Sequence, residues 1–317
     1  MMINLLESKI LLTGGNGFVG KHLYAKLLER GVKPEAITIP DKDKDDVRDM
    51  NNCKRLVKDV DIIINLAGNV GGIGYNRENP GTLFYDNIML GVNLIEAARL
   101  ENKVKKFVQI GTICAYPKFT PVPFKEEDLW NGYPEETNAP YGIAKKALLV
   151  MLQAYRQQYG FPGIFLLPVN MYGPGDNFNP ASSHVIPALI LKIHNAIQEN
   201  LPTVEVWGDG SATREFFYVE DAVEAIIDAT EKYDKEDPIN IGAGMEISIK
   251  DLVTKLAGIM GYKGEIVWDT SKPNGQPRRM LDTSKAKKEF GFVAKTSFDD
   301  GLKTTIDWYN SNNGSIR

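Results

Sequence analysis

The chain reads KILLTGGNGFVG from Lys9 to Gly20, and this stretch decides the fold of its N-terminal half. Apolar residues up to Thr13 predict a short buried strand, and apolar residues at helical spacing resume after Gly20. Glycines between them allow a tight turn, close approach of a pyrophosphate to the backbone, and tight packing of helix on strand. The alternative is a turn whose glycines bind nothing, but strand, turn and helix in this order predict a dinucleotide site. Its predicted contacts are Gly14, Gly17, Phe18, Val19 and Gly20.

Strand-like and helical segments alternate through the first half of the chain. Short buried strands are expected at Ala36–Ile39, Asp61–Leu66, Lys106–Ile110 and Gly163–Pro168, and long helices at Thr82–Leu100 and Gly142–Tyr159. This alternation predicts an α/β fold with a doubly wound parallel sheet of the Rossmann type.

The composition of the chain and the order of its predicted elements change after Pro168. Met171–Pro180 is rich in Gly, Pro and Asn, and the short elements that follow lack the earlier rhythm. They predict a smaller, discontinuous α/β lobe that binds substrate. We expect a dinucleotide-binding domain at 1–170 plus 217–260, and a second domain at 171–216 plus 261–317.

Composition excludes several classes of protein. With 37 Lys and Arg against 41 Asp and Glu, the net charge is −4, which argues against a nucleic-acid partner. No apolar run reaches the roughly 18 residues of a membrane span. Cys53 and Cys114 cannot form a disulfide framework, and no Cys and His lie at the spacing of zinc ligands. We therefore expect a cytoplasmic protein without a metal centre.

The segment after the second strand bears on the choice of cofactor. Asp41 lies about 20 residues beyond the glycine turn, where a carboxylate binds the ribose hydroxyls of NAD. Lys42 and Lys44 would instead favour the 2′-phosphate of NADP, unless they belong to a solvated loop. The residues leave NADP and NAD open. Further predicted cofactor contacts are Lys42, Asp49, Leu66, Ala67, Gly68 and Pro168.

Tyr141 and Lys145 share one face at the start of a predicted helix. An ammonium beside a phenol lowers the phenol's pKa, which makes the tyrosine a proton donor or acceptor at a carbonyl. Thr112 follows a strand at the carboxyl edge, where ligands of doubly wound sheets bind. The alternatives are a surface Tyr and Lys and an ordinary threonine at the end of a strand.

Cys114 and His184 are the other candidate reactive residues. Taken alone, Cys114 is a small buried apolar residue and His184 is a structural histidine at the start of a helix.

Longer strings of sequence carry a family resemblance. They include TICAYP at 112–117, TNAPYGIAK at 137–145, YGPGDNF at 172–178, SHVIPAL at 183–189 and REF at 214–216. With these strings the chain resembles the extended short-chain dehydrogenase/reductases that act on nucleotide sugars, and within them the GDP-L-fucose synthase subfamily. The resemblance covers nearly the whole chain.

The resemblance implies an NAD(P)H-dependent epimerase-reductase that converts GDP-4-keto-6-deoxymannose to GDP-L-fucose. It assigns reduction to Thr112, Tyr141 and Lys145, and epimerisation to Cys114 and His184. It also implies NADP as the cofactor and a homodimer built on a four-helix interface. The substrate contacts that it implies are Asn170, Lys192, Trp207, Arg214 and Arg279.

The chain departs from the family pattern at several positions. Thr112 stands where Ser is usual, and Asn16 and Asp41 stand where the family has arginines that bind the NADP phosphate. A reductase or an epimerase for another 4-keto nucleotide sugar therefore stays open, as does a silent dinucleotide sensor. Ile113 and Cys114 replace the acidic pair of the 4,6-dehydratases, which disfavours that reaction.

Overall fold

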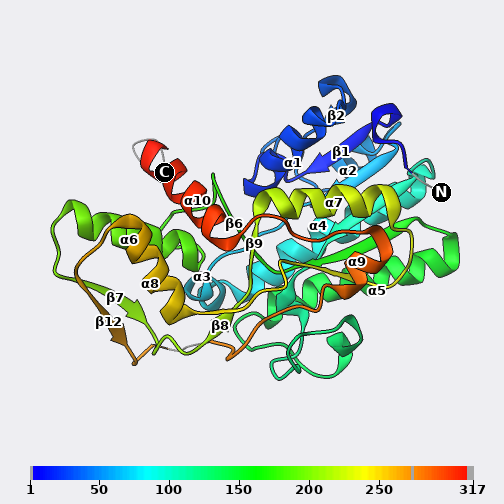
Figure 1. Ribbon diagram of the computed structural model, residues 1–317. Helices are drawn as coiled ribbons and strands as arrows, with labels where there is room; N and C mark the ends of the chain where they lie inside the picture. The colour runs from blue at the N-terminus through cyan, green and yellow to red at the C-terminus, as the bar shows by residue number, and fades with distance from the viewer. Residues whose placement is uncertain (1–2, 273–274, 313–317) are drawn as a thin grey trace.

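The computed structural model describes residues 3–272 and 275–312, and its centre is a six-stranded sheet (Figure 1). All five strand pairings in the sheet are parallel. From one edge to the other its strands are β2 (Ile37–Thr38), β1 (Ile10–Thr13), β3 (Ile62–Asn65), β4 (Lys106–Ile110), β5 (Gly163–Pro168) and β10 (Ile239–Ile241). The predicted doubly wound α/β fold is confirmed.

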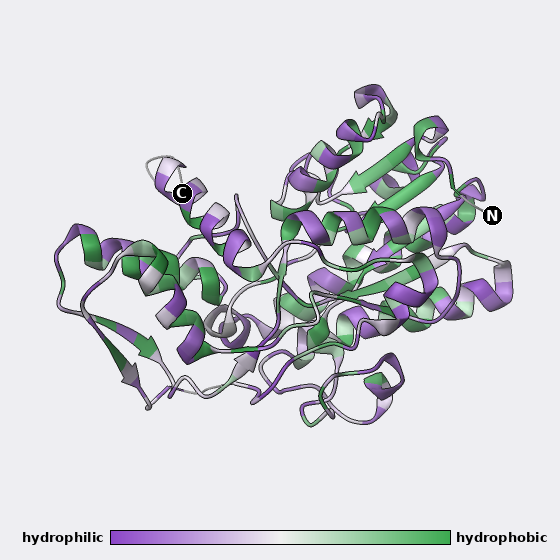
Figure 2. Ribbon diagram, viewed as in Figure 1, coloured by the Kyte–Doolittle hydropathy of each residue, from purple (hydrophilic) through white to green (hydrophobic). Residues whose placement is uncertain are grey.

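Helices cover both faces of this sheet. One layer contains α1 (Phe18–Glu29), α7 (Val219–Lys232) and α9 (Ser284–Phe290), and the other contains α2 (Met50–Leu56), α4 (Pro80–Glu101) and α5 (Ala139–Tyr159). The strands between them are mainly apolar (Figure 2), and Ile62, Ile63 and Ile64 are fully buried. Burial on both faces explains why these strands are mainly apolar rather than alternating between apolar and polar residues.

A second hydrophobic core lies to one side of the sheet (Figure 1). Its helices are α6 (Val185–Gln198), α8 (Ile249–Met260) and α10 (Phe298–Asn312). Three two-stranded pairs accompany them: β6 (Asn170–Tyr172) with β9 (Phe216–Tyr218), β7 (Thr203–Trp207) with β12 (Glu265–Asp269), and β8 (Thr213–Arg214) with β11 (Ile247–Ser248).

The two cores exchange segments along the sequence. Leu252 and Leu256 of α8 are buried in the second core, although the sequence pattern groups 217–260 with the dinucleotide-binding domain. Conversely, Ala286 and Phe290 of α9 are buried in the first core, within the range expected for the other domain. The discontinuity is therefore finer than the sequence pattern indicates.

Several element boundaries differ from the sequence-based ones for local reasons. β2 is shorter than expected because Pro34–Ala36 forms a 3-10 turn before it and Pro40, which lacks an N–H, follows it. Helices α4 and α5 start earlier than predicted, each with a proline in its first turn. Ser248 caps α8, since its side chain accepts a hydrogen bond from the Asp251 N–H.

No helix in the described ranges combines the length and the apolarity that crossing a bilayer requires.

Candidate active site

The glycine turn between β1 and α1 is closely packed. Gly14 has a φ of +70°, and a Cβ there would lie 2.9 Å from the Ala67 nitrogen. A Cβ on Gly20 would lie 2.2 Å from the Gly14 carbonyl oxygen, so only glycine lets the helix approach the turn. Gly17 caps α1 without a side-chain acceptor, which leaves the first N–H groups of the helix for a ligand. Phe18 and Val19 open that helix, and the turn fits a dinucleotide pyrophosphate.

The charged loop after β2 is held mainly by its own residues. Asp41 accepts a hydrogen bond from the Asp43 N–H at 2.9 Å, and its carboxylate lies 3.7 Å from the Lys44 ammonium. Asp49 caps α2 by accepting from the Asn51 N–H at 2.7 Å. Lys42 is exposed beside this loop and is the predicted cation for a 2′-phosphate.

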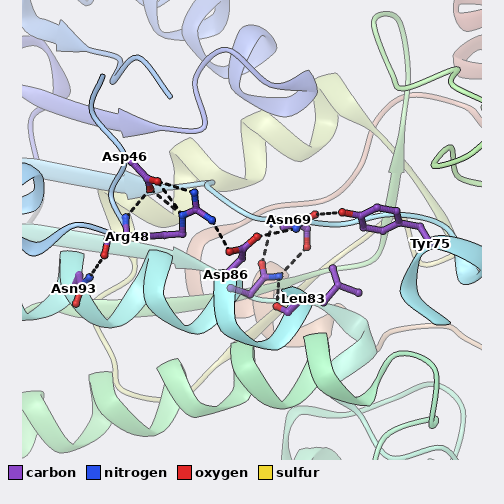
Figure 3. A network of polar contacts seen from close by, with 8 residues as sticks. Asp46, Arg48, Asn69, Tyr75, Leu83, Asp86 and Asn93 are labelled. Atoms are coloured by element: carbon purple, nitrogen blue, oxygen red, sulfur yellow. Dashed lines mark hydrogen bonds and ion pairs between the residues drawn. The ribbon is translucent and has the colours of Figure 1, made fainter. Parts of the chain in front are cut away.

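A polar network then joins this loop to the one after β3 (Figure 3). Asp86 on α4 accepts from Arg48 at 2.6 Å with one carboxylate oxygen and from the Asn69 side-chain amide at 2.9 Å with the other. Arg48 is also paired with Asp46, and Asn69 accepts from the Tyr75 hydroxyl at 3.2 Å. One buried carboxylate therefore fixes two loops at the carboxyl edge of the sheet.

The loop after β3 also meets the reductive residues. The Lys145 ammonium donates to the Ala67 carbonyl at 3.2 Å, and a Cβ on Gly68 would lie 3.5 Å from the same nitrogen. Leu66 begins this loop, and Pro168 ends β5 at the same edge of the sheet.

Thr112 and Tyr141 are brought together as the sequence predicts. Thr112 follows β4 and caps a 3-10 turn, where its hydroxyl accepts from the Cys114 N–H at 3.1 Å. Tyr141 lies in the first turn of α5 and hydrogen-bonds the Thr112 side chain. The two hydroxyls can therefore address one carbonyl oxygen.

The ionisation of Tyr141 differs from the expectation. Burial, followed by the neighbouring Cys114, raises the phenol's pKa, and only the hydrogen bond to Thr112 opposes them. Burial also lowers the pKa of Lys145 to about 8. The Lys145 ammonium, which donates to the Ala67 carbonyl, does not contribute to the shift of the phenol's pKa.

Cys114 lies between an amide and a guanidinium. Its sulfur is 3.7 Å from the Asn138 side-chain oxygen and 3.6 Å from Nη1 of Arg279. Sequence reasoning did not single out Asn138, although its position three residues before Tyr141 at the start of a helix was a usable signal. Both neighbours are buried.

The loop that precedes α6 and ends at His184 contacts the segment after β3, which in turn contacts Asn138. The Gly72 N–H donates to the carbonyl of Ser182 at 3.1 Å, and the Asn76 side-chain amide donates to Asn138 at 3.2 Å. His184 itself caps α6 and its residue is exposed, while partial desolvation by the surrounding protein lowers the pKa of the imidazole. A neutral imidazole can accept a proton.

The predicted substrate residues form two clusters. Arg214 and Arg279 are electrostatic neighbours, and burial followed by repulsion from Arg279 lowers the pKa of Arg214 to about 10. Trp207 is exposed, and the ammonium groups of Lys192 and Lys272 lie 5.9 and 5.6 Å from its ring centre. Asn170 on β6 donates to the Glu215 carbonyl at 3.5 Å.

Comparison with known proteins agrees with this architecture. The profile of the NAD dependent epimerase/dehydratase family matches residues 10–242. The chain belongs to this family. Among its relatives, a putative GDP-L-fucose synthase 2 from Arabidopsis thaliana is 38% identical over 96% of this chain and 93% of its own length. The GDP-L-fucose synthase of Escherichia coli (strain K12) is 36% identical over 98% of this chain and 99% of its own.

A solved structure shares the whole fold. The GDP-mannoheptose C4 reductase from Campylobacter jejuni with NADP bound has a TM-score of 0.88 and 28% identity, and the match covers 97% of this chain and all of that one. The predicted resemblance to nucleotide-sugar enzymes of the extended short-chain dehydrogenase/reductase type is thus confirmed.

Proposed function

We propose that this protein converts GDP-4-keto-6-deoxymannose to GDP-L-fucose by epimerisation at C3 and C5 and reduction at C4. The observation that carries the proposal is the convergence of Thr112, Tyr141 and Cys114 beside the cofactor turn. A pair of hydroxyls that could bind a carbonyl, next to a thiol that could move protons on the adjacent carbons, supports this reaction. The relatives named as GDP-L-fucose synthases support the same reaction.

Epimerisation uses the acidity of the carbons beside the 4-keto group. One of Cys114 and His184 takes a proton, the C–H electron pair moves to the carbonyl oxygen, and the other returns a proton to the opposite face. Tyr141 and Thr112 donate hydrogen bonds to that oxygen and stabilise the enolate. A raised phenol pKa suits Tyr141 as a donor, because it keeps the hydroxyl protonated.

NADPH fits the cofactor turn and, when bound, supplies the hydride for C4. Gly14, Gly17 and Gly20 would hold the pyrophosphate, and Lys42 the 2′-phosphate. Tyr141 then gives its proton to O4 as C4 is reduced. The NADP-bound neighbour supports NADP over NAD, although Asp41 keeps NADH as the cofactor to compare.

For the substrate, we propose that Arg214 and Arg279 bind the diphosphate, since two neighbouring guanidinium groups match the charge and geometry of phosphate oxygens. Trp207 offers an exposed ring for the base, with Lys192 beside it, and Asn170 lies on β6. In this proposal the part of the protein built on the first core binds the cofactor, and the part built on the second core binds the nucleotide sugar.

We further propose a cytoplasmic homodimer. Helices α4 and α5 pack together and expose Phe84, Tyr85 and Val150, which suit a four-helix interface between two copies. Tyr85→Glu combined with Val150→Glu should halve the mass measured by sedimentation. Both cysteines are free thiols, in keeping with a reducing compartment, and cell fractionation tests the location.

A C4 reductase without epimerase activity is the second candidate, favoured by the solved C4 reductase of the same fold. Turnover of GDP-4-keto-6-deoxymannose in D₂O separates the two, with NADPH and NADH tried in parallel. Cofactor oxidation with deuterium at C3 and C5 supports the epimerase-reductase. Oxidation without deuterium supports the reductase, and the absence of any oxidation rejects this substrate.

A further inference from the structure

The surroundings of Cys114 suit both protonation states of its sulfur. On one side the Asn138 side-chain oxygen, 3.7 Å away, can accept a hydrogen bond from a thiol. On another the Arg279 guanidinium, with Nη1 at 3.6 Å, can donate to a thiolate. A thiol cannot use the cation as an acceptor, and a thiolate cannot donate to the amide oxygen.

Asn138 is held so that its oxygen faces the thiol. Its side-chain nitrogen donates to the Glu135 carboxylate at 2.6 Å, which fixes the orientation of the amide. The Asn76 side-chain amide donates to the side-chain oxygen of Asn138 at 3.2 Å. Glu135 is itself held by the Thr137 hydroxyl at 2.6 Å. A rotated Asn138 amide would lose its bonds to Glu135 and to Asn76.

Arg279 is fixed with its charge uncompensated. It is only 8% exposed, its Nε donates to the Gln276 side-chain oxygen at 2.7 Å, and Gln276 is anchored on the Lys118 carbonyl at 2.8 Å. Among the described residues, no carboxylate forms an ion pair with it. A buried cation lacking a carboxylate is stabilised by whatever negative charge forms next to it, and the sulfur of Cys114 is such a place.

We propose that Asn138 and Arg279 are positioning residues that stabilise the two states of Cys114 in turn, the thiol through the amide oxygen and the thiolate through the guanidinium. This inference rests on the proposed role of Cys114 in proton transfer. When a carbon proton moves to sulfur, the S–H bond formed turns toward Asn138. When the sulfur gives up its proton, the Arg279 guanidinium donates to the thiolate and stabilises its negative charge.

Alkylation of Cys114 by iodoacetamide tests the proposal in the resting enzyme, because only the thiolate reacts. Cys53 is fully buried and serves as the internal control, so peptide mass spectrometry reports the Cys114 rate alone. In Arg279→Gln the rate near neutral pH should fall about fivefold, and Arg279→Lys should restore most of it. Asn138→Ala should raise the rate, since the thiol loses its acceptor.

Arg278→Gln is the matched control. Arg278 is the adjacent residue, but its guanidinium is exposed and pairs with Glu246 at 3.0 Å. Its alkylation rate should equal that of the wild type. A wild-type rate in Arg279→Gln, or an equal loss in Arg278→Gln, would overturn the proposal. Thermal unfolding of each variant identifies a rate change that comes from misfolding.

Isotope exchange then connects the sulfur to the reaction. Arg279→Gln should slow deuterium incorporation into the 4-keto sugar more than it weakens substrate binding, whereas loss of a diphosphate contact alone would raise KM and spare kcat. A change confined to KM therefore contradicts the positioning role. If the wild type exchanges no deuterium, the proposed epimerase function fails. The alkylation rates still decide whether Asn138 and Arg279 stabilise the two states of Cys114.

Discussion

At the scale of single residues, the prediction that tests the mechanism most directly concerns Tyr141. Tyr141→Phe keeps the ring but removes the hydroxyl that hydrogen-bonds Thr112. We expect kcat for reduction to fall by about 10²- to 10⁴-fold, the usual contribution of a positioned proton donor. Cofactor oxidation under saturating substrate measures the loss. Tyr133→Phe, at an exposed tyrosine in the preceding loop, should change nothing, and full activity of Tyr141→Phe would remove the tyrosine from the mechanism.

The same residue shows how far sequence reasoning reaches. The spacing of Tyr141 and Lys145 on one helix face was predictable because it depends on local geometry alone. The partner of Lys145 was not, since the Ala67 carbonyl comes from a loop 78 residues away in sequence. For the same reason the contact between Cys114 and Arg279, 165 residues apart, had no local signal.

At the scale of elements, helix α4 holds the loops after β2 and β3 in place through Asp86. Asp86→Asn should weaken the Arg48 contact and loosen both loops, raising KM for the cofactor about three- to tenfold with little change in kcat. Steady-state kinetics at saturating sugar nucleotide measures both constants.

Glu96→Gln is the matched control, because it lies on the same helix and pairs with Arg99 away from these loops. An Arg48→Gln, Asp86→Asn double variant should be little worse than either single variant, since both remove one interaction. Additive losses in KM would show that the two side chains act separately.

Elements were predicted where periodicity is local and missed where packing decides. The runs that became β3, β4 and β5 are buried along their whole length and mainly apolar, so their type and place followed from sequence. Helix α8 has an apolar face that includes Leu252, Val253 and Leu256. Only the tertiary contacts of Leu252 and Leu256 assign it to the second core.

At the scale of the whole molecule, His22 joins segments from both parts of the chain. Its Nδ1 lies 2.5 Å from the Glu220 carboxylate on α7, and its Nε2 lies 2.7 Å from the Pro174 carbonyl in the loop that leads to His184. Only an imidazolium donates from both nitrogens. Burial works against that charge, but the hydrogen bonds to Glu220 and Pro174 outweigh it and raise the His22 pKa above 6.5. Lys26 also lies near Glu220, at 3.9 Å, and Glu224 is 3.5 Å from Lys26.

A raised pKa in the folded state means that the folded protein binds the proton more tightly than the unfolded chain does. The stabilisation is therefore complete below about pH 6.5 and is lost as the pH rises through the folded-state pKa. His22→Gln should lower the melting temperature by a few degrees near pH 6 and by less near pH 8.5. Calorimetry at the two pH values measures the difference. Lys21→Gln, an exposed neighbour, should affect both equally. A His22→Gln loss that is the same at both values would show that the histidine contributes packing and not charge, and that the loop before His184 is held by other contacts.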